Sequence, residues 1–359
     1  MVTFRERKAK YCNIKLLLIF LVVYGHMIET AITYSGIAEI IYQYIYLVHM
    51  LAFIYITGYF VHSKTQCRIL LKRYAGMYLI IQGIMILTSR IEGIQNILAG
   101  DTIHNIRNLH LFYPYWHLWY LLSLVAWLGV AQLWFTLKDM AEERKPKITV
   151  RGKVLCIVML AVCGCLVGKC NQIGRVMSLS RTIVYLPYFI AGLFTSGEKD
   201  WKRYRIPAAI LMVTAMIVLQ RFIRDIPYQL LWQADSYDKL FIKAGEMKRL
   251  LCYLAGGILV FGILTGMPEK RSKLSVLGTD TLPVYIAHPY VLLLFKNRGL
   301  MIKSNYQNIL TTITELLTGL LMRFIVMVTI YQFHRFSKKF VAYGMKRNML
   351  KDACRNSES

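Results

Sequence analysis

Residues 14–34 read IKLLLIFLVVYGHMIETAITY, and this stretch sets the expectation for the whole chain. It is as long as the run of about 20 apolar residues that a helix needs to cross a bilayer core. It nevertheless contains His26 and Glu29. Ionisable residues are costly inside a membrane and are functional candidates by default. The stretch therefore predicts a membrane-spanning helix with a site on it.

Similar apolar blocks recur along the 359 residues, 56% of which are hydrophobic. A soluble domain has about 45–50% apolar residues. The runs are continuous rather than alternating, which favours helices over a membrane barrel. We predict an all-α integral membrane protein, a bundle of about ten transmembrane helices. The predicted spans are 14–34, 38–61, 74–89, 115–136, 153–169, 180–196, 206–222, 249–267, 279–296 and 309–333.

The net charge of +25 is distributed as membrane topology requires. With the N-terminus inside, the segments on the cytoplasmic side hold about twice as many lysines and arginines as those outside. The positive-inside rule therefore places both termini in the cytoplasm. Because the charges alternate between sides and form no basic face, we exclude nucleic acid as a partner.

The chain is predicted to form one transmembrane domain over 1–335, followed by a polar, basic cytoplasmic tail over 336–359. The basic start is read as leading into a retained first helix and not as a cleaved signal peptide. The eight cysteines include no CxxC pair, and we expect no metal site.

Three histidines fall near the middle of predicted spans, His26 in the first, His49 in the second and His288 in the ninth. They could meet near the midplane of the bilayer. Glu29 follows His26 by three residues, shares its helix face and could orient the imidazole. The four form the predicted catalytic group. The alternative is that the histidines are inert and are kept neutral by backbone carbonyls.

Lys15 precedes His26 by eleven residues, which is about three helical turns and about 16 Å along one side of a helix. A cation at the cytoplasmic rim is thus aligned with a base near mid-membrane. This suits a donor with an anionic head and a long arm, the shape of coenzyme A. Arg68, Lys72 and Arg73 cluster at the cytoplasmic side and could add phosphate contacts. Ordinary positive-inside charge is the alternative for each of them.

The outer side offers weaker candidates. The loop 223–248 mixes aromatic residues with aspartates, a combination that suits a sugar but is also typical of an interfacial aromatic belt. His117 and Trp119 stand at the outer start of the fourth span, and Arg323 lies in the tenth. We take these three as candidate substrate-binding residues. For Arg323, packing against other helices is the favoured alternative.

Five motifs occur in one order along residues 10–335. They are Asn13-Ile-Lys15 through LLLIFLVVYGHM ending past His26, YLVHMLAFIYITGYF at 46–60, YWHLWYLLSL at 115–124, LPYFIAGLF at 186–194, and LPVYIAHPYVLLLF at 282–295. In these motifs the chain resembles the acyltransferase 3 family of membrane O-acyltransferases, including its fucose 4-O-acetylase-like branch. Lys15 stands where many members have arginine.

The resemblance implies transfer of an acyl group, usually acetyl from cytoplasmic acetyl-CoA, to a hydroxyl of a cell-envelope glycan or its lipid-linked precursor. It places His26 at the family's catalytic histidine, and Lys15 with the 68–73 cluster at its donor-binding residues. It implies a multi-pass protein of the plasma membrane. A homo-oligomer or a glycan-assembly protein remains open as a partner.

A transporter or permease for a small solute is the main alternative, because ionisable residues at the midplane also mark transport paths. Transporters often carry inverted repeats, and the sequence shows none. The sequence thus favours an enzyme.

Overall fold

A computed structural model of the chain describes residues 4–29, 31–33, 35–91, 110–142, 149–196 and 202–297, together with residues 328, 331 and 332. Within these residues the fold is helical, with ten α-helices and, outside them, a single isolated bridge between His110 and Tyr113. The α-helices are α1 Phe4–Ile28, α2 Gly36–Tyr59, α3 Lys64–Thr88, α5 Trp119–Glu142, α6 Val150–Val167, α7 Leu179–Phe194, α8 Arg205–Phe222, α9 Tyr228–Leu231, α10 Gly245–Gly266 and α11 Leu282–Asn297. Short 3₁₀ turns are η1 Trp116–Leu118, η2 Val176–Ser178, η3 Lys202–Tyr204, η4 Ile223–Asp225 and η5 Leu274–Val276.

The predicted all-α membrane bundle is confirmed. Eight helices within the described part of the chain are long and apolar enough to cross a membrane, and they correspond to the first eight predicted spans. The ninth predicted span is α11, whose apolar part, Leu282–Leu292, is shorter. The tenth, 309–333, lies outside the described residues except for three positions, as does the tail 336–359.

Several helix boundaries differ from the prediction by six residues or more, at both ends of α1, at the start of α3 and at the end of α5. α1 ends at Ile28, six residues before the predicted end of its span. α3 begins at Lys64 rather than at residue 74, because the Ser63 side chain accepts a hydrogen bond from the Gln66 amide and caps the helix. A search for apolar residues alone misses this basic first part of the helix.

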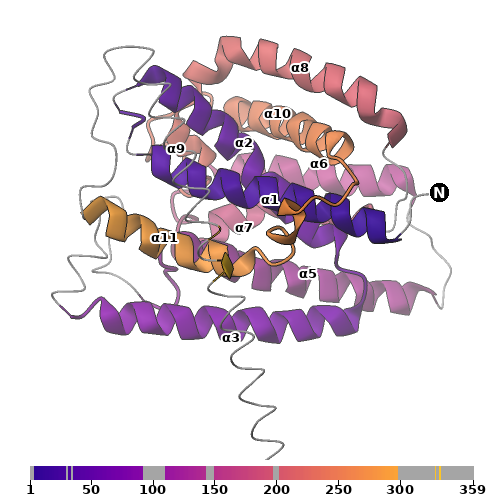
Figure 1. Cartoon of the computed structure of the whole chain (residues 1–359), viewed down its shortest axis with the longest axis horizontal. Coiled ribbons are helices and arrows are strands. Elements are labelled where there is room, and N and C mark those ends of the chain that lie inside the picture. The colour runs from indigo at the N-terminus through magenta and orange to yellow at the C-terminus, as the bar shows by residue number, and fades with distance from the viewer. Residues whose placement is uncertain are drawn as a thin grey trace, which may run out of the picture.

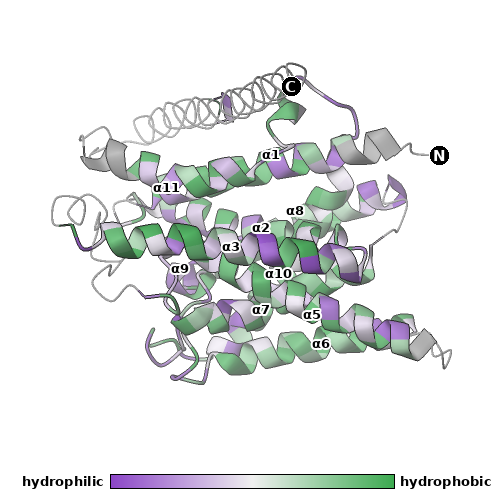
Figure 2. Cartoon of the chain, turned by 90° about the horizontal axis from the view of Figure 1, so that it is seen from below, coloured by the Kyte–Doolittle hydropathy of each residue, from purple (hydrophilic) through white to green (hydrophobic). Residues whose placement is uncertain are grey.

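The long helices lie side by side, with the N-terminus and α9 at opposite ends of the bundle (Figure 1). α2 is central: 61% of its apolar window is buried, against 17% for α3 and 11% for α6. The outer helices α3, α6 and α8 expose large apolar side chains, and α6 is largely hydrophobic along its length (Figure 2). This apolar exterior is the surface that a bilayer covers.

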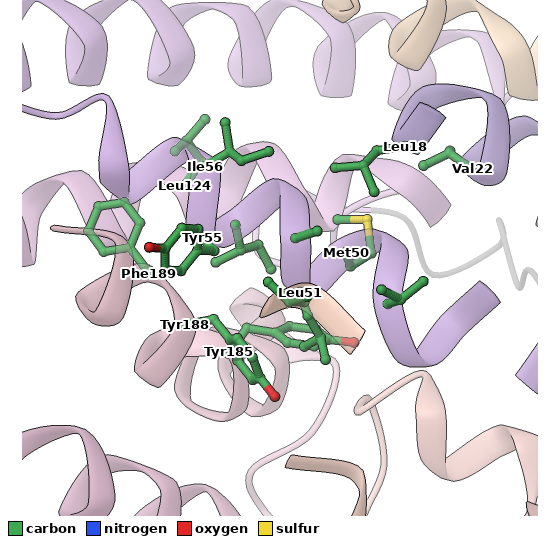
Figure 3. Close-up of a cluster of buried hydrophobic side chains, with 14 of the residues drawn as sticks. Leu18, Val22, Met50, Leu51, Tyr55, Ile56, Leu124, Tyr185, Tyr188 and Phe189 are labelled. Carbon is green, nitrogen blue, oxygen red and sulfur yellow. The ribbon is translucent and has the colours of Figure 1, made fainter. Parts of the chain in front are cut away.

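Glycines set the distance between α2 and α7. A Cβ atom on Gly58 would collide with the Phe189 carbonyl oxygen, and one on Gly192 with the Tyr55 carbonyl oxygen. Small residues allow membrane helices to approach this closely and so to gain packing contacts. Around this contact lies the main cluster of buried side chains, part of which Figure 3 shows between α1, α2, α5 and α7.

Candidate active site

One face of α1 lines two cavities in the bundle. The lining residues recur at intervals of four or three, the spacing that keeps side chains on one side of a helix. They are Lys15, Ile19, Val22, His26 and Glu29. The first two line one cavity and the last three line another. We call them the inner and outer cavities, after the predicted cytoplasmic and external sides.

The inner cavity has a volume of about 260 Å³. Lys15 of α1 and Arg73 of α3 are its two basic lining residues. The Lys15 ammonium donates a hydrogen bond of 3.3 Å to the Thr279 carbonyl, at the start of the loop segment that leads into α11. The remaining wall is Ile19, Met50, Phe53, Ile56, Thr57, Tyr74, Tyr120, Leu124, Thr279, Asp280, Thr281, Leu282 and Tyr285.

The motif residue Asn13 fixes this side of the cavity. Its amide nitrogen donates to the carbonyls of Pro268 and Lys270, at 2.9 and 3.0 Å, and its oxygen accepts from the Ser275 hydroxyl. One asparagine thus ties α1 to the loop between α10 and α11. This explains structurally why the motif begins at Asn13.

The outer cavity, about 130 Å³, contains most of the predicted catalytic and acceptor residues. His26, Glu29 and His49 line it, together with His117 and Trp119. Its other lining residues are Val22, Tyr46, Met50, Tyr113, Pro114, Tyr115, Trp116, Arg175, Arg181, Tyr185, Leu231, Trp232 and Tyr285.

His26 is held by groups from three elements. Its Nδ1 lies 3.5 Å from a Glu29 carboxylate oxygen and 3.3 Å from the Tyr46 hydroxyl. The Trp116 ring meets it edge-on at 5.0 Å, and the His288 ring stacks against it at 5.4 Å. With Nδ1 directed to the carboxylate, the second nitrogen, Nε2, is left to act on a ligand. This is the arrangement of an acid-oriented general base.

The Trp116 backbone has a φ of 28°, a conformation that side-chain-bearing residues rarely adopt. Such strain persists only where surrounding structure enforces it, and it clusters at functional sites. Here it occurs in the turn that begins η1 and that places the Trp116 ring against His26. His117 follows directly and lines the same cavity.

His49 and His288 differ from His26 in their hydrogen bonds. Nδ1 of His49 donates to the Ile45 carbonyl at 2.6 Å, and Nδ1 of His288 donates to the Val284 carbonyl at 3.1 Å. A carbonyl only accepts, so both rings carry a proton on Nδ1. In the neutral form, Nε2 then offers a lone pair and no proton. His288 is fully buried, packs behind His26 and is not among the residues lining the outer cavity.

Two arginines of the outer cavity were not among the predicted site residues. Arg175 makes a bidentate pair with Asp235, with nitrogen–oxygen distances of 2.8 to 3.2 Å. These hydrogen bonds to Asp235 raise the pKa of Arg175. The Arg181 guanidinium lies 5.0 Å from the centre of the Trp119 ring and donates from Nε to the Trp232 carbonyl at 2.9 Å. An arginine just inside a predicted span was the signal that could have identified Arg181.

The remaining predicted donor residues do not gather in one place. Arg73 lines the inner cavity, whereas Arg68 and Lys72 are exposed elsewhere on α3. Arg68 and Lys72 are four residues apart and share one face of α3, whereas Arg73 is turned by about 100° from Lys72. Arg323 lies outside the described residues.

The loop 223–248 mainly closes the outer end of the bundle. Tyr237 is buried and its hydroxyl donates to the Cys165 carbonyl at 2.7 Å, while Asp235 is engaged by Arg175. Trp232 faces the outer cavity, and its indole nitrogen donates to the Tyr42 hydroxyl at 2.7 Å. The aromatic and acidic residues of the loop thus serve largely to hold it in place.

These features define a polytopic membrane protein in which His26, His49 and His117 line the outer of two cavities. The model of the acyltransferase 3 family, described as an acyltransferase domain, matches residues 13–332, and the chain belongs to this family. Membership implies acyltransferase activity. No curated protein and no solved structure matches the chain.

Proposed function

We propose that the protein transfers an acetyl group from cytoplasmic acetyl-CoA to a hydroxyl of a cell-envelope glycan or its lipid-linked precursor, at the plasma membrane, with His26 as general base. The observation that supports this most is the stripe on α1, which brings Lys15 into the inner cavity and His26 into the outer one. A single helix face thus links a cationic entrance to a base, over the length that a pantetheine arm has to cover.

On the donor side, Lys15 and Arg73 are the cations that line the inner cavity, and they suit the phosphates of coenzyme A. Arg68 and Lys72 are exposed, so we propose that they attract the anionic donor at longer range. Tyr74 and Phe53 supply apolar wall for the uncharged arm.

On the acceptor side, the hydroxyl would lie against Nε2 of His26, which takes its proton as the oxygen attacks the thioester carbonyl. Glu29 stabilises the imidazolium that forms. The tetrahedral intermediate then collapses, the carbon–sulfur bond breaks, and His26 returns the proton to the thiolate of coenzyme A. Trp119 and His117 lie in the wall of this cavity, and we propose that they contact the acceptor.

The oxyanion of the intermediate needs a hydrogen-bond donor. His49 or His288 could donate a hydrogen bond to the oxyanion only with both ring nitrogens protonated, because the Nδ1–H group of each already donates to a backbone carbonyl. The outer cavity is also lined by the Tyr46 hydroxyl and the Arg181 guanidinium. Both can donate a hydrogen bond in their ordinary protonation states. We therefore assign His49 and His288 to positioning His26, and we propose Tyr46 or Arg181 for the oxyanion.

The test is mass spectrometry of envelope glycans from cells with the wild-type gene, without it, and with His26→Ala. Loss of the base is expected to lower the rate about 10²–10⁴-fold, so the variant should lack the acetyl group that the wild type adds. The amount of inserted protein serves as control. Wild-type acetylation by a fully inserted His26→Ala protein would refute the role of His26.

Transport of a small solute remains the second candidate, favoured by one observation: the two cavities are stacked along α1 between the predicted sides of the membrane. Proteoliposomes separate the two functions. Consumption of acetyl-CoA supports the transferase, whereas uptake of a labelled solute without it supports transport.

A further inference from the structure

Two residues line both cavities: Met50 of α2 and Tyr285 of α11. The inner cavity continues from them toward Lys15 and the outer cavity toward His26. They therefore form the partition between the space for the donor and the space for the base. Met50 retains 8% of its exposure and Tyr285 retains 9%, so both side chains are packed into this wall.

The two sides of the partition differ in rigidity. The Tyr285 hydroxyl donates to the His117 carbonyl, and its ring packs edge-on against Tyr120 at 5.5 Å and His117 at 5.6 Å. Methionine, by contrast, is unbranched with three rotatable bonds and adapts to its surroundings. Met50 belongs to the buried cluster seen in Figure 3. Tyr285 is fixed in place, whereas the Met50 side chain can move. The conformation of Met50 therefore determines the width of any passage between the cavities.

We propose that Met50, which with Tyr285 lines both cavities, determines the length of the acyl group that the enzyme accepts, and that it restricts the donor to short acyl chains such as acetyl. The inference rests on the proposed function. The acyl group is the part of the donor farthest from the phosphates, so it reaches the partition first. Its carbonyl has to come within reach of the hydroxyl held at His26.

The size of the outer cavity supports selection at this point. The outer cavity is small, at about 130 Å³, and it must also hold the acceptor hydroxyl. A long acyl chain that passed the partition would compete with the acceptor for this space. A chain that stayed behind it would keep the thioester carbonyl away from His26. Only a short group avoids both conflicts.

The experiment measures coenzyme A release by the purified full-length protein in proteoliposomes, with acetyl-, propionyl-, butyryl- and hexanoyl-CoA as donors. The acceptor is envelope glycan isolated from cells that lack the gene. We expect the wild type to use acetyl-CoA at least tenfold better than butyryl-CoA, by kcat/KM. Met50→Ala should raise the ratio of butyryl to acetyl activity at least tenfold, and the milder Met50→Val should raise it less.

Ile54→Ala is the matched control, since Ile54 lies one turn further along α2, is fully buried and lines none of the cavities described here. It should leave the ratio unchanged. If Met50→Ala does not fold, the Met50→Val ratio decides. An active wild type whose preference is the same in the Met50 variants would overturn this inference alone. Failure of the wild type to use any acyl-CoA would overturn the proposed function and the inference with it.

Discussion

The interaction between His26 and Glu29 gives the sharpest test of the mechanism. Replacing Glu29 with glutamine keeps the size of the side chain and removes its charge. The two side chains approach to 3.5 Å and retain 15% and 13% of their exposure. A unit charge pair at about 4 Å has an interaction energy of about 4 kcal/mol at an effective dielectric constant of about 20. Partial exposure to solvent reduces this, and we take about 2 kcal/mol as the loss.

If Glu29 stabilises the imidazolium of the transition state, about 2 kcal/mol corresponds to a fall in kcat of roughly thirtyfold. KM for acetyl-CoA should stay close to the wild-type value, because the site that we propose for the donor phosphates is in the other cavity. Coenzyme A release in proteoliposomes, with isolated glycan as acceptor, measures both constants. A Glu29→Gln enzyme with kcat within twofold of wild type would refute the role of the carboxylate.

Other substitutions test the two cavities and the packing. Lys15→Ala removes a phosphate contact of about 1.5–3 kcal/mol, so KM for acetyl-CoA should rise at least tenfold while Lys15→Arg restores it; an unchanged KM would contradict this. Gly192→Ala forces a Cβ into the α2 backbone and should cost about 1–3 kcal/mol in thermal unfolding in detergent, whereas Gly76→Ala, with open space around it, should not destabilise. Asp235→Asn leaves Arg175 without its carboxylate and should lower the melting temperature, with loss of up to about 1 kcal/mol for this partly exposed pair; a melting temperature equal to wild type would show that the pair is not structural.

Much of the fold could be predicted from the sequence, because the membrane requires a minimum length of each apolar helix and a bias of positive charge in the segments on one side. Eight apolar runs correspond to eight helices of sufficient length, including 153–169 and 206–222. Boundaries were harder, since they depend on local hydrogen bonds. The cap at Ser63 starts α3 ten residues before its apolar run, and no hydropathy pattern signals it.

The site was predictable in part. The alignment of Lys15 with His26 follows from the geometry of one helix, and in the structure each of them lines a cavity. The grouping of Arg68, Lys72 and Arg73 required knowing which way α3 faces, and only Arg73 is directed to the inner cavity. The positions of Arg181 and Met50 in the cavity walls depend on contacts between α7, α2 and α5. The sequence of a single segment does not specify such contacts.

The three central histidines show why such contacts decide chemistry. In sequence, His26, His49 and His288 look alike, each within an apolar run. In the structure, His49 and His288 each donate a hydrogen bond from Nδ1 to a carbonyl one turn earlier in their own helix. This fixes their tautomer and leaves the neutral ring without a second N–H group to donate to a ligand. Nδ1 of His26 instead lies near two side chains, the Glu29 carboxylate and the Tyr46 hydroxyl, and not near a backbone carbonyl four residues earlier. Its Nδ1 therefore lies beside groups that can respond to a reaction, and this difference is the reason why we propose His26 as the base.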